Sequence, residues 1–274
     1  MSIITITTEA YSTGHALAES VARKMGYPCI GEEITTTAAE IYGISDTKIN
    51  QTLKNSKSLL SPLFHRQHHI IACLEAVLME KMLDPNLVYT GFLGLPKIQE
   101  VSHAIKVRII ASPEERIRRA QQKENISDKV AAEDRILKED AQRKRWCKSV
   151  YGIDITDPGL YDLVVNLGHM ESQDAVETIA MTASHKKFQP MTYSLNCMKN
   201  IALSSRIKAA FGEIDPKMEV KSDRGAVYVF AGALKRKQQS KLLAFKERIK
   251  QTDGVEHVEV YVKKEIFESK ARGN

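Results

Sequence analysis

The stretch SIITITTEAYSTGHALAESVARKMGYP, residues 2–28, decides the fold of the first part of the chain. Its opening residues are mostly β-branched, which predicts a short buried strand over residues 2–8. Ser12 or Thr13 can then cap a helix whose apolar residues recur at helical spacing, and Gly26 ends that helix. A strand, a Ser/Thr/Gly turn and a helix in this order are typical of the opening of a nucleotide-binding α/β domain.

Strands and helices are expected to alternate through the rest of the first part of the chain. Further strands are predicted at 87–91, 105–111 and 161–166. Helices are predicted as short pieces within 32–60, as an apolar stripe over 63–82, after the cap and proline of Ser112-Pro113, over about 128–150, and over 173–184. Strands alternating with helices imply an α/β domain, with a parallel sheet covered on both faces.

The pattern changes after HKKFQP (185–190). A helix over about 196–211, two alternating strands meeting near residues 223–225, a helix over about 236–251 and a strand from His257 follow. This α-β-β-α-β order predicts a small α+β domain with helices on a three-stranded sheet. We therefore expect two domains, residues 1–185 and 191–265.

The charge is divided between these two parts. The net charge is +6, but residues 1–185 hold 21 Lys and Arg against 24 Asp and Glu, whereas residues 186–274 hold 19 against 10. The basic second part indicates an anionic partner, such as nucleic acid, a membrane surface or an acidic protein. A solvated lysine-rich surface is the alternative interpretation.

The composition is that of a globular protein of the cell interior. The four cysteines are scattered, without metal-ligand spacing, which is typical of reduced thiols: Cys29, Cys73, Cys147 and Cys197. No apolar run approaches the roughly 18 residues that span a membrane, and the first residues lack a basic stretch with an apolar core. A cytoplasmic location is expected, and association into a homo-oligomer stays open.

Three stretches of the first part, taken together, resemble the cytidylate-kinase-like family of P-loop nucleotide kinases. ITITTEAYSTGHALAESVARKMGYP (4–28) stands where the family has a strand, a Gly-Ser-Gly-Gly turn and a helix, and VYTGFLG (88–94) is similar to its Val-Gly-Arg-Gly strand end. The segment from VRIIASPEER (107–116) through ENISDKVAAEDR (124–135) to YDLVVN (161–166) carries the family's Arg-rich helix, linker and last strand in order. The resemblance implies a P-loop kinase-like sheet and the cofactors ATP and Mg²⁺.

The second part resembles a BON domain. GAVYVFAG (225–232) and GVEHVEV (254–260) carry this resemblance within residues 194–263. BON domains are associated with membranes or hydrophobic ligands, usually in exported proteins. The resemblance therefore implies an interaction module.

The phosphate loop departs from the family pattern. Phosphoryl transfer needs phosphates held by backbone N–H groups and cations that neutralise charge. The loop here is EAYSTGH (9–15), with one glycine and no following lysine. Tyr11 and Thr13 disfavour the positive φ values that such a loop uses. The helix N-terminus still predicts weak phosphate binding at Ser12, Thr13, Gly14 and His15, so ATP and Mg²⁺ are expected to be weakly held, if held at all.

The lid region keeps charged residues at regular spacing. Arg116 and Arg119 lie three apart on one helix, and Asp140 and Arg143 repeat that spacing. By resemblance Arg116, Asp140 and Arg143 are the catalytic candidates, whereas Arg119 and Gly91 contact the nucleotide. Exposed ion pairs on charged helices are the alternative interpretation.

Three other features point elsewhere. Phe92 stands where the family has arginine and cannot grip a phosphate. Of the histidines His65, His68 and His69, the first and the last share a helical face, but no third ligand is evident, so no metal site is predicted. Trp146 lies in a basic stretch that could stack on a base, but a helix packing its tryptophan against the domain is the favoured interpretation.

These observations favour a nucleotide-binding protein with an eroded phosphate loop, whose transfer of phosphate from ATP to a nucleoside monophosphate is weak or lost. Its role would then be sensing or regulatory, with a CMP-like nucleotide or ATP as ligand. An active CMP kinase is one alternative. The other is an interaction protein that docks on a membrane or an anionic partner through its basic BON-like part.

Overall fold

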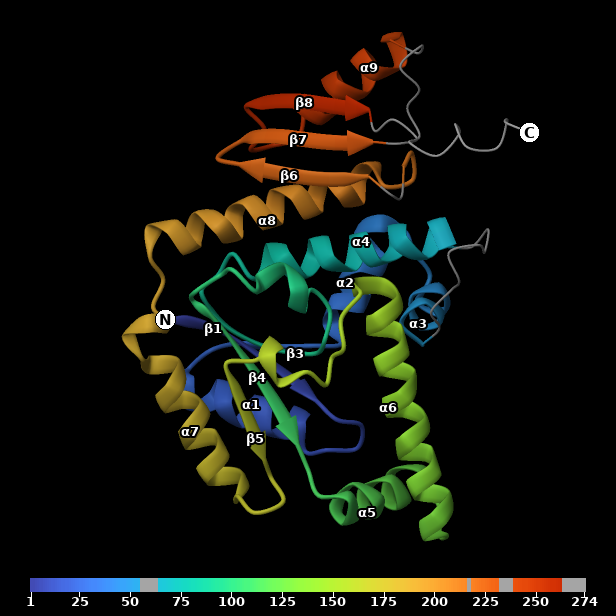
Figure 1. Cartoon of the computed structure of the whole chain (residues 1–274), viewed down its shortest axis with the longest axis vertical. Helices are drawn as coiled ribbons and strands as arrows, with labels where there is room; N and C mark the ends of the chain where they lie inside the picture. The colour runs from blue at the N-terminus through green and yellow to red at the C-terminus, as the bar shows by residue number, and fades with distance from the viewer. Residues whose placement is uncertain (55–63, 216–217, 232–238, 263–274) are drawn as a thin grey trace, which may run out of the picture.

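The computed structural model describes residues 1–54, 64–215, 218–231 and 239–262 (Figure 1). Its larger sheet is parallel, with strand order β2-β3-β1-β4-β5. The strands are β1 (Ser2–Thr8), β2 (Cys29–Ile30), β3 (Asn86–Thr90), β4 (Ala104–Ile110) and β5 (Leu163–Asn166). The predicted parallel sheet is thus confirmed. Strand β2 was not predicted, because two residues are too few to show a strand pattern in the sequence.

The central strand β1 is buried on both faces, as its β-branched sequence predicted. Ile3 packs into the core on one face, whereas Ile4 and Ile6 pack into the core on the other. Thr5 and Thr7 lie on the Ile3 side, and their hydroxyls donate to the carbonyls of Ile105 (3.3 Å) and Gly91 (2.9 Å). Each buried hydroxyl therefore has the partner that burial requires.

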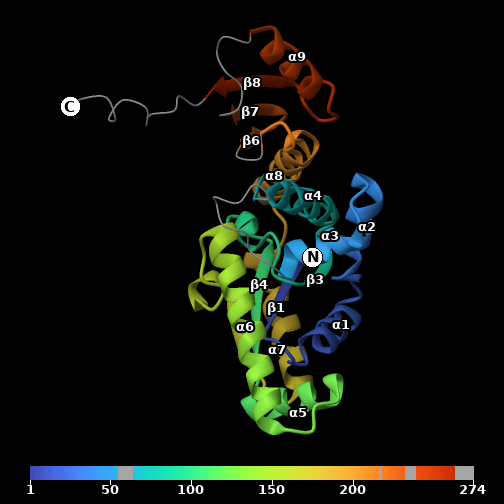
Figure 2. The same ribbon diagram turned by 90° about the vertical axis from the view of Figure 1, so that its right-hand side faces the viewer.

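Helices cover both faces of this sheet (Figures 1 and 2). One face packs against α1 (Gly14–Met25) and α7 (Ser172–Ser184). The other packs against α2 (Glu33–Tyr42), α3 (Asp46–Lys54), α4 (Phe64–Lys81) and α6 (Lys129–Tyr151). Helix α5 (Pro113–Glu124) and the short 3-10 helices η1 (Leu95–Ile98), η2 (Pro158–Leu160) and η3 (Lys186–Phe188) complete this part.

Several helix ends follow the signals in the sequence. Ser112 caps α5, its hydroxyl accepting from the N–H of Glu115 at 3.3 Å, and Asp128 caps α6 through its carboxylate. Gly26 and Gly152 adopt left-handed conformations just after α1 and α6. The predicted ends of these elements are confirmed because the local chemistry fixes them.

Trp146 of α6 is fully buried, as favoured from the sequence. Its indole N–H donates to the carbonyl of Thr52 at 2.7 Å. Its ring packs edge-on against Phe92 and Tyr151, with centroid distances of 5.3 and 5.5 Å. Helix α6 is therefore anchored to the body of the protein at this residue, while its first half extends away toward α5 (Figure 1).

The C-terminal part forms a separate mixed sheet of strand order β6-β7-β8. Strands β6 and β7 are antiparallel, and β7 and β8 are parallel. The elements are α8 (Thr192–Phe211), β6 (Glu219–Asp223), β7 (Ala226–Ala231), α9 (Gln239–Lys250) and β8 (His257–Val262). The predicted α-β-β-α-β order is confirmed, but α8 begins earlier than about residue 196 because the hydroxyl of Ser194 accepts from the N–H of Met191 at 3.1 Å.

Helix α8 is shared by the two parts of the chain (Figures 1 and 2). Met198 and Ala202 pack into the core that contains α4. Leu203, Ile207 and Phe211 pack into the core beneath the C-terminal sheet. Neither the first core nor the second is complete without this helix. In the described part of the chain, no helix is long and apolar enough to cross a membrane.

A single substitution in α8 tests this sharing. Met198→Ala removes a fully buried side chain, and we expect the free energy of unfolding, followed by the fluorescence of Trp146 in the first part, to fall by about 3 kcal/mol. Met181→Ala, at a methionine that is 67% exposed on α7, is the matched control. An unchanged transition at Trp146 in Met198→Ala would contradict a shared core.

His103 precedes β4 and is fully buried. Neither of its ring nitrogens has a hydrogen-bond partner among the described residues. Burial lowers the pKa of this imidazole below its ordinary value of 6.5, because the charged form would lack water. His103 is therefore held neutral in the folded protein.

This burial makes stability depend on pH. As the pH falls, the unfolded chain takes up a proton at His103 before the folded chain does. The contribution of this residue to stability is therefore full above about pH 6.5 and declines below it. We expect His103→Leu to reduce the loss of unfolding free energy between pH 7 and pH 5 by about 1 kcal/mol, measured by urea unfolding. His185→Gln, at an exposed histidine, should leave the slope unchanged, and equal slopes for all three proteins would contradict the assignment.

Candidate functional site

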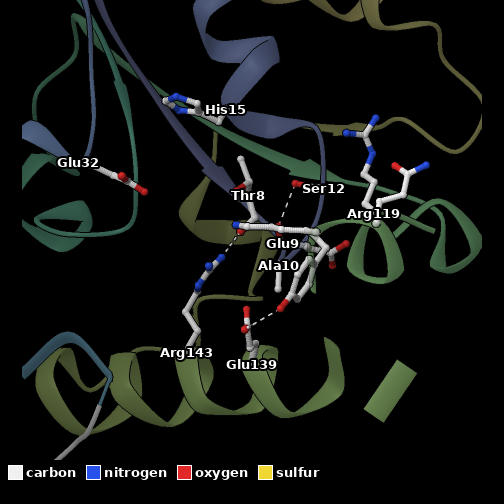
Figure 3. Close-up of a pocket in the computed structure, with 12 residues that line it drawn as sticks. Thr8, Glu9, Ala10, Ser12, His15, Glu32, Arg119, Glu139 and Arg143 are labelled. Atoms are coloured by element: carbon white, nitrogen blue, oxygen red, sulfur yellow. Dashed lines mark hydrogen bonds between the residues drawn. The ribbon is translucent and has the colours of Figure 1, made fainter. Parts of the chain in front are cut away.

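The carboxyl ends of the parallel strands form one edge of the larger sheet. From β1 the chain forms β2 and β3 on one side of β1, and then β4 and β5 on the other side. The strand order therefore reverses at β1. In open α/β sheets, ligands bind outside the carboxyl ends at such a reversal. A cavity of 570 Å³ lies there (Figure 3), lined by Thr8, Glu9, Ala10, Tyr11, Ser12, His15, Glu32, Arg119, Gln122, Lys123, Glu139 and Arg143.

The loop from Glu9 to Thr13 keeps a tight turn despite its lack of glycine. Tyr11 has φ +57°, a left-handed conformation that non-glycine residues rarely adopt. The hydroxyl of Ser12 donates to the carbonyl of Glu9 at 2.9 Å and accepts from the N–H of Gly14 at 3.3 Å. A Cβ at Gly14 would lie 1.9 Å from the Thr8 side chain, so this position requires glycine.

Side chains from α5 and α6 bind the backbone of this loop. Arg116 donates to the carbonyl of Ala10 at 2.9 Å, and Asp140 accepts from the N–H of the same residue at 3.1 Å. Arg116 and Asp140 also form an ion pair, and Arg143 donates to the carbonyl of Thr8 (Figure 3). The three predicted catalytic residues are thus brought together. Arg116 and Arg143 bind oxygens of the chain, and Asp140 binds the N–H of Ala10 and the guanidinium of Arg116.

The carboxylate of Glu9 lies among positive groups. It is 3.5 Å from Arg108 and 3.5 Å from Arg116, and it accepts from the N–H of Ala111 at 3.3 Å. Arg108 and Arg116 are buried, with about a tenth of each side chain exposed (9% and 11%). The carboxylate of Glu9 therefore occupies the place where two arginines and a backbone N–H converge.

The side chain of Tyr11 joins the loop to both helices of the lid. Its ring packs against the small apolar core between α5 and α6. Its hydroxyl lies 3.0 Å from the carboxylate of Glu139 and 3.2 Å from that of Glu124, so its one proton is shared between them, and it accepts from Arg135 at 3.3 Å. Burial first, and the two carboxylates with it, raise the pKa of this phenol above its ordinary value, so Tyr11 stays protonated.

A second cavity adjoins the first and shares Arg143 and Glu139 with it. It has a volume of 390 Å³ and is lined by Asn50, Leu53, Lys54, Phe92, Arg135, Lys138, Glu139, Gln142 and Arg143. The guanidinium of Arg143 lies 5.4 Å from the ring centroid of Phe92. Phe92 thus supports Arg143 between the two cavities, a contact that its apolar character alone did not indicate.

The other predicted residues lie around the same edge in different situations. Ser12, His15 and Arg119 line the first cavity, but the side chain of His15 is 65% exposed beside Glu19, and Arg119 pairs with Glu115 at 2.9 Å. The hydroxyl of Thr13 is buried without a partner among the described residues. Gly91 ends β3, its N–H donating to Ile6 at 3.0 Å.

Sequence reasoning missed Arg108 and the pairing of Glu9. The two charged residues inside a strand that is otherwise apolar, Lys106 and Arg108, were the available signal, since a buried charge requires a partner. His65, one of the three histidines considered for metal binding, has a side chain outside the described residues. Among the side chains that the structure describes, no group of three His, Cys, Asp or Glu is placed to hold a metal ion.

Comparison with known proteins assigns this architecture to a family. Residues 3–169 match the model of the cytidylate kinase-like family. The chain belongs to this family. Membership supports a nucleotide kinase-like function, and the cytidylate kinase-like part coincides with the parallel sheet and its lid.

Individual relatives agree. The chain is 27% identical to the cytidylate kinase of Archaeoglobus fulgidus, over 68% of this chain and 97% of that protein. It is 26% identical to the cytidylate kinase of Ignicoccus hospitalis, over 65% and 97%. Among solved structures, it is similar to an uncharacterized protein from Eubacterium ventriosum, with a TM-score of 0.48 and 20% identity over 66% of this chain and 97% of that one.

The pairing of Arg116 can be tested through stability. Arg116→Ala leaves the carboxylates of Glu9 and Asp140, which are 20% and 32% exposed, without this cation. We expect urea unfolding to give a free energy lower by about 2 kcal/mol, less than for a fully buried pair because water reaches both carboxylates. Arg118→Ala, on the same helix with 67% of its side chain exposed, is the control. Equal effects of the two substitutions would contradict the pairing.

Proposed function

We propose that this cytidylate kinase-like chain binds nucleotide through an eroded phosphate loop, so that transfer of phosphate from ATP to a nucleoside monophosphate is weak or lost. Its role would then be to sense or regulate through nucleotide binding. The proposal rests on how the loop and the lid bind each other, because the cations that a kinase presents to phosphates here have partners within the chain.

The observation that carries the proposal is the engagement of the arginines. Arg143 binds the carboxyl end of β1, Arg116 binds Ala10 and Asp140, and the carboxylate of Glu9 lies between Arg108 and Arg116. An incoming phosphate would have to displace the protein's own oxygens from these groups. Such competition weakens binding because each displaced carbonyl or carboxylate loses a hydrogen bond.

The loop fits a phosphate only in part. The N–H groups at the start of α1 and the hydroxyl of Thr13, which is unpaired within the described chain, offer donors, whereas the Ser12 hydroxyl already donates to the carbonyl of Glu9. No lysine follows Gly14, and the ring of Tyr11 takes the space beside the lid. ATP, with Mg²⁺ to neutralise its phosphates, would thus be held weakly, by Ser12, Thr13, Gly14 and His15 and by the nearby Arg119.

The two adjoining cavities support two ligand positions with Arg143 between them. The cavity at the loop suits a phosphate donor. The cavity beside α3 and α6 carries Asn50, Lys54 and Gln142, groups that can bind the polar edge of a base or a phosphate. A CMP-like nucleotide in this second cavity, contacting the strand end at Gly91, is the acceptor that the family relationship favours.

The C-terminal part would act as an interaction module. We propose residues 191–265 as a BON-like domain fused to the kinase-like domain of residues 1–185, with α8 as the helix that both use. The excess of nine positive charges in residues 186–274 favours an anionic partner.

A coupled assay with ATP, Mg²⁺ and each of CMP, dCMP, UMP and AMP tests the proposal. We expect turnover at least about a hundredfold below the roughly 10 per second typical of enzymes, because the arginines are engaged and the loop lysine is absent. Calorimetry with the same nucleotides is expected to detect binding. Turnover near the typical value would make the chain an active CMP kinase and overturn the proposal.

A double substitution supplies the matched variant for this assay. Tyr11→Gly with Thr13→Gly gives the loop the Gly-Ser-Gly-Gly turn of the family and frees the lid from Tyr11. ATP affinity is expected to rise about tenfold, since glycine adopts φ +57° without strain. Arg143→Ala is the comparison variant, and its turnover is expected to fall below that of the unsubstituted chain. Unchanged ATP affinity in the double substitution would contradict the role given to the loop.

A further inference from the structure

A groove distant from the phosphate loop lies where α8 meets the turns of the C-terminal sheet. Its volume is 300 Å³, and its walls come from the end of α4, one face of α8, the β6–β7 turn and the turn before β8. The residues of α8 that face it include Asn196, Lys199, Asn200 and Arg206. The groove thus joins parts of the chain that are far apart in sequence.

Arg206 lies half-buried in this groove with part of its guanidinium unpaired. One Nη donates to the carbonyl of Asp253 at 2.8 Å, which fixes the group beside the turn before β8. Its Nε is buried and has no hydrogen-bond partner among the described residues. Because Nε is buried, a ligand in the groove would meet the Nη groups of this guanidinium.

The β6–β7 turn brings a second arginine to the groove in a strained conformation. Arg224 and Gly225 form the two-residue turn, with φ +45° and +83°. Such turns favour asparagine followed by glycine, because both residues are left-handed. The side chain of Asn200 holds this turn against α8 by accepting from the N–H of Arg224 at 2.9 Å. The hairpin thus places the side chain of Arg224 at the groove.

The charges of the lining residues favour an anion. Lys199, Arg206 and Arg224 face a single acidic lining residue, Glu80. Arg224 is 3.6 Å from Asp223, but both side chains are mostly exposed (79% and 65%), so this pair exchanges readily with solvent. Two guanidinium groups and one ammonium within a small groove match the oxygens of a phosphate group.

The groove also keeps room for a ligand. Gly254 lines it in a left-handed conformation, with φ +81°. A volume of 300 Å³ accommodates a phosphate with a small organic group attached. We propose that this groove binds a small phosphate-bearing ligand from solution, through Arg206, Arg224 and Lys199, at the junction of the two parts of the chain.

Titration of the full chain with inorganic phosphate tests the site. Isothermal calorimetry is expected to show binding that Arg206→Gln weakens about tenfold and Lys199→Gln several-fold. Lys199 is exposed, so Lys199→Gln keeps the test valid if Arg206→Gln fails to fold. Lys250→Gln, an exposed lysine on α9 away from the groove, should leave the affinity unchanged. Equal affinity in all four proteins would overturn the proposal.

Hydrogen exchange of the full chain locates the ligand. Phosphate is expected to protect backbone amides at 222–226 and 253–255, whereas protection confined to residues 9–15 would assign binding to the phosphate loop and overturn the proposal. Binding of the full chain to vesicles of phosphatidylglycerol, compared with vesicles of phosphatidylcholine, shows whether a lipid headgroup supplies the phosphate. Binding to the anionic vesicles without binding of free phosphate would replace the small ligand by a membrane surface.

Discussion

The contact between the loop after β1 and the lid helices is the interaction on which the site depends. A loop with polar backbone groups must satisfy them, and here Thr8 and Ala10 are satisfied by Arg143, Arg116 and Asp140. The N–H groups of Arg116 and Arg143 would otherwise be available for phosphates. Under the proposed function, hydrogen bonds within the chain and hydrogen bonds to a phosphate would compete for one set of donors, so the closed contact would lower the affinity of the site.

The second constraint is the sharing of α8. One face of this helix completes the core against α4, and another completes the core beneath the C-terminal sheet. A helix packed on two sides cannot shift against one neighbour without disturbing the other, since packed interiors have few voids. The kinase-like part and the C-terminal part are therefore connected by a rigid element, and the basic groove lies beside it.

Much of the fold could be predicted because local chemistry specifies it. β-branched runs, the caps at Ser112 and Asp128 and the glycine after α6 each determine an element from neighbouring residues. The site was only partly predictable. The resemblance to the family indicated Arg116, Asp140 and Arg143, but the pairing of Glu9 with Arg108 depends on the register of β1 and β4, which sequence pattern does not give. The groove of Arg206 and Arg224 required the packing of distant segments.

Trp146 has a consequence for the study of this protein in solution. It is the single tryptophan of the chain, and it lies in a dry environment against Phe92, the ring that also supports Arg143. Its emission reports on the junction between the lid helix and the two cavities without any introduced label. The molecule thus carries an intrinsic optical sensor, positioned one aromatic ring away from the guanidinium that the ligands would compete for.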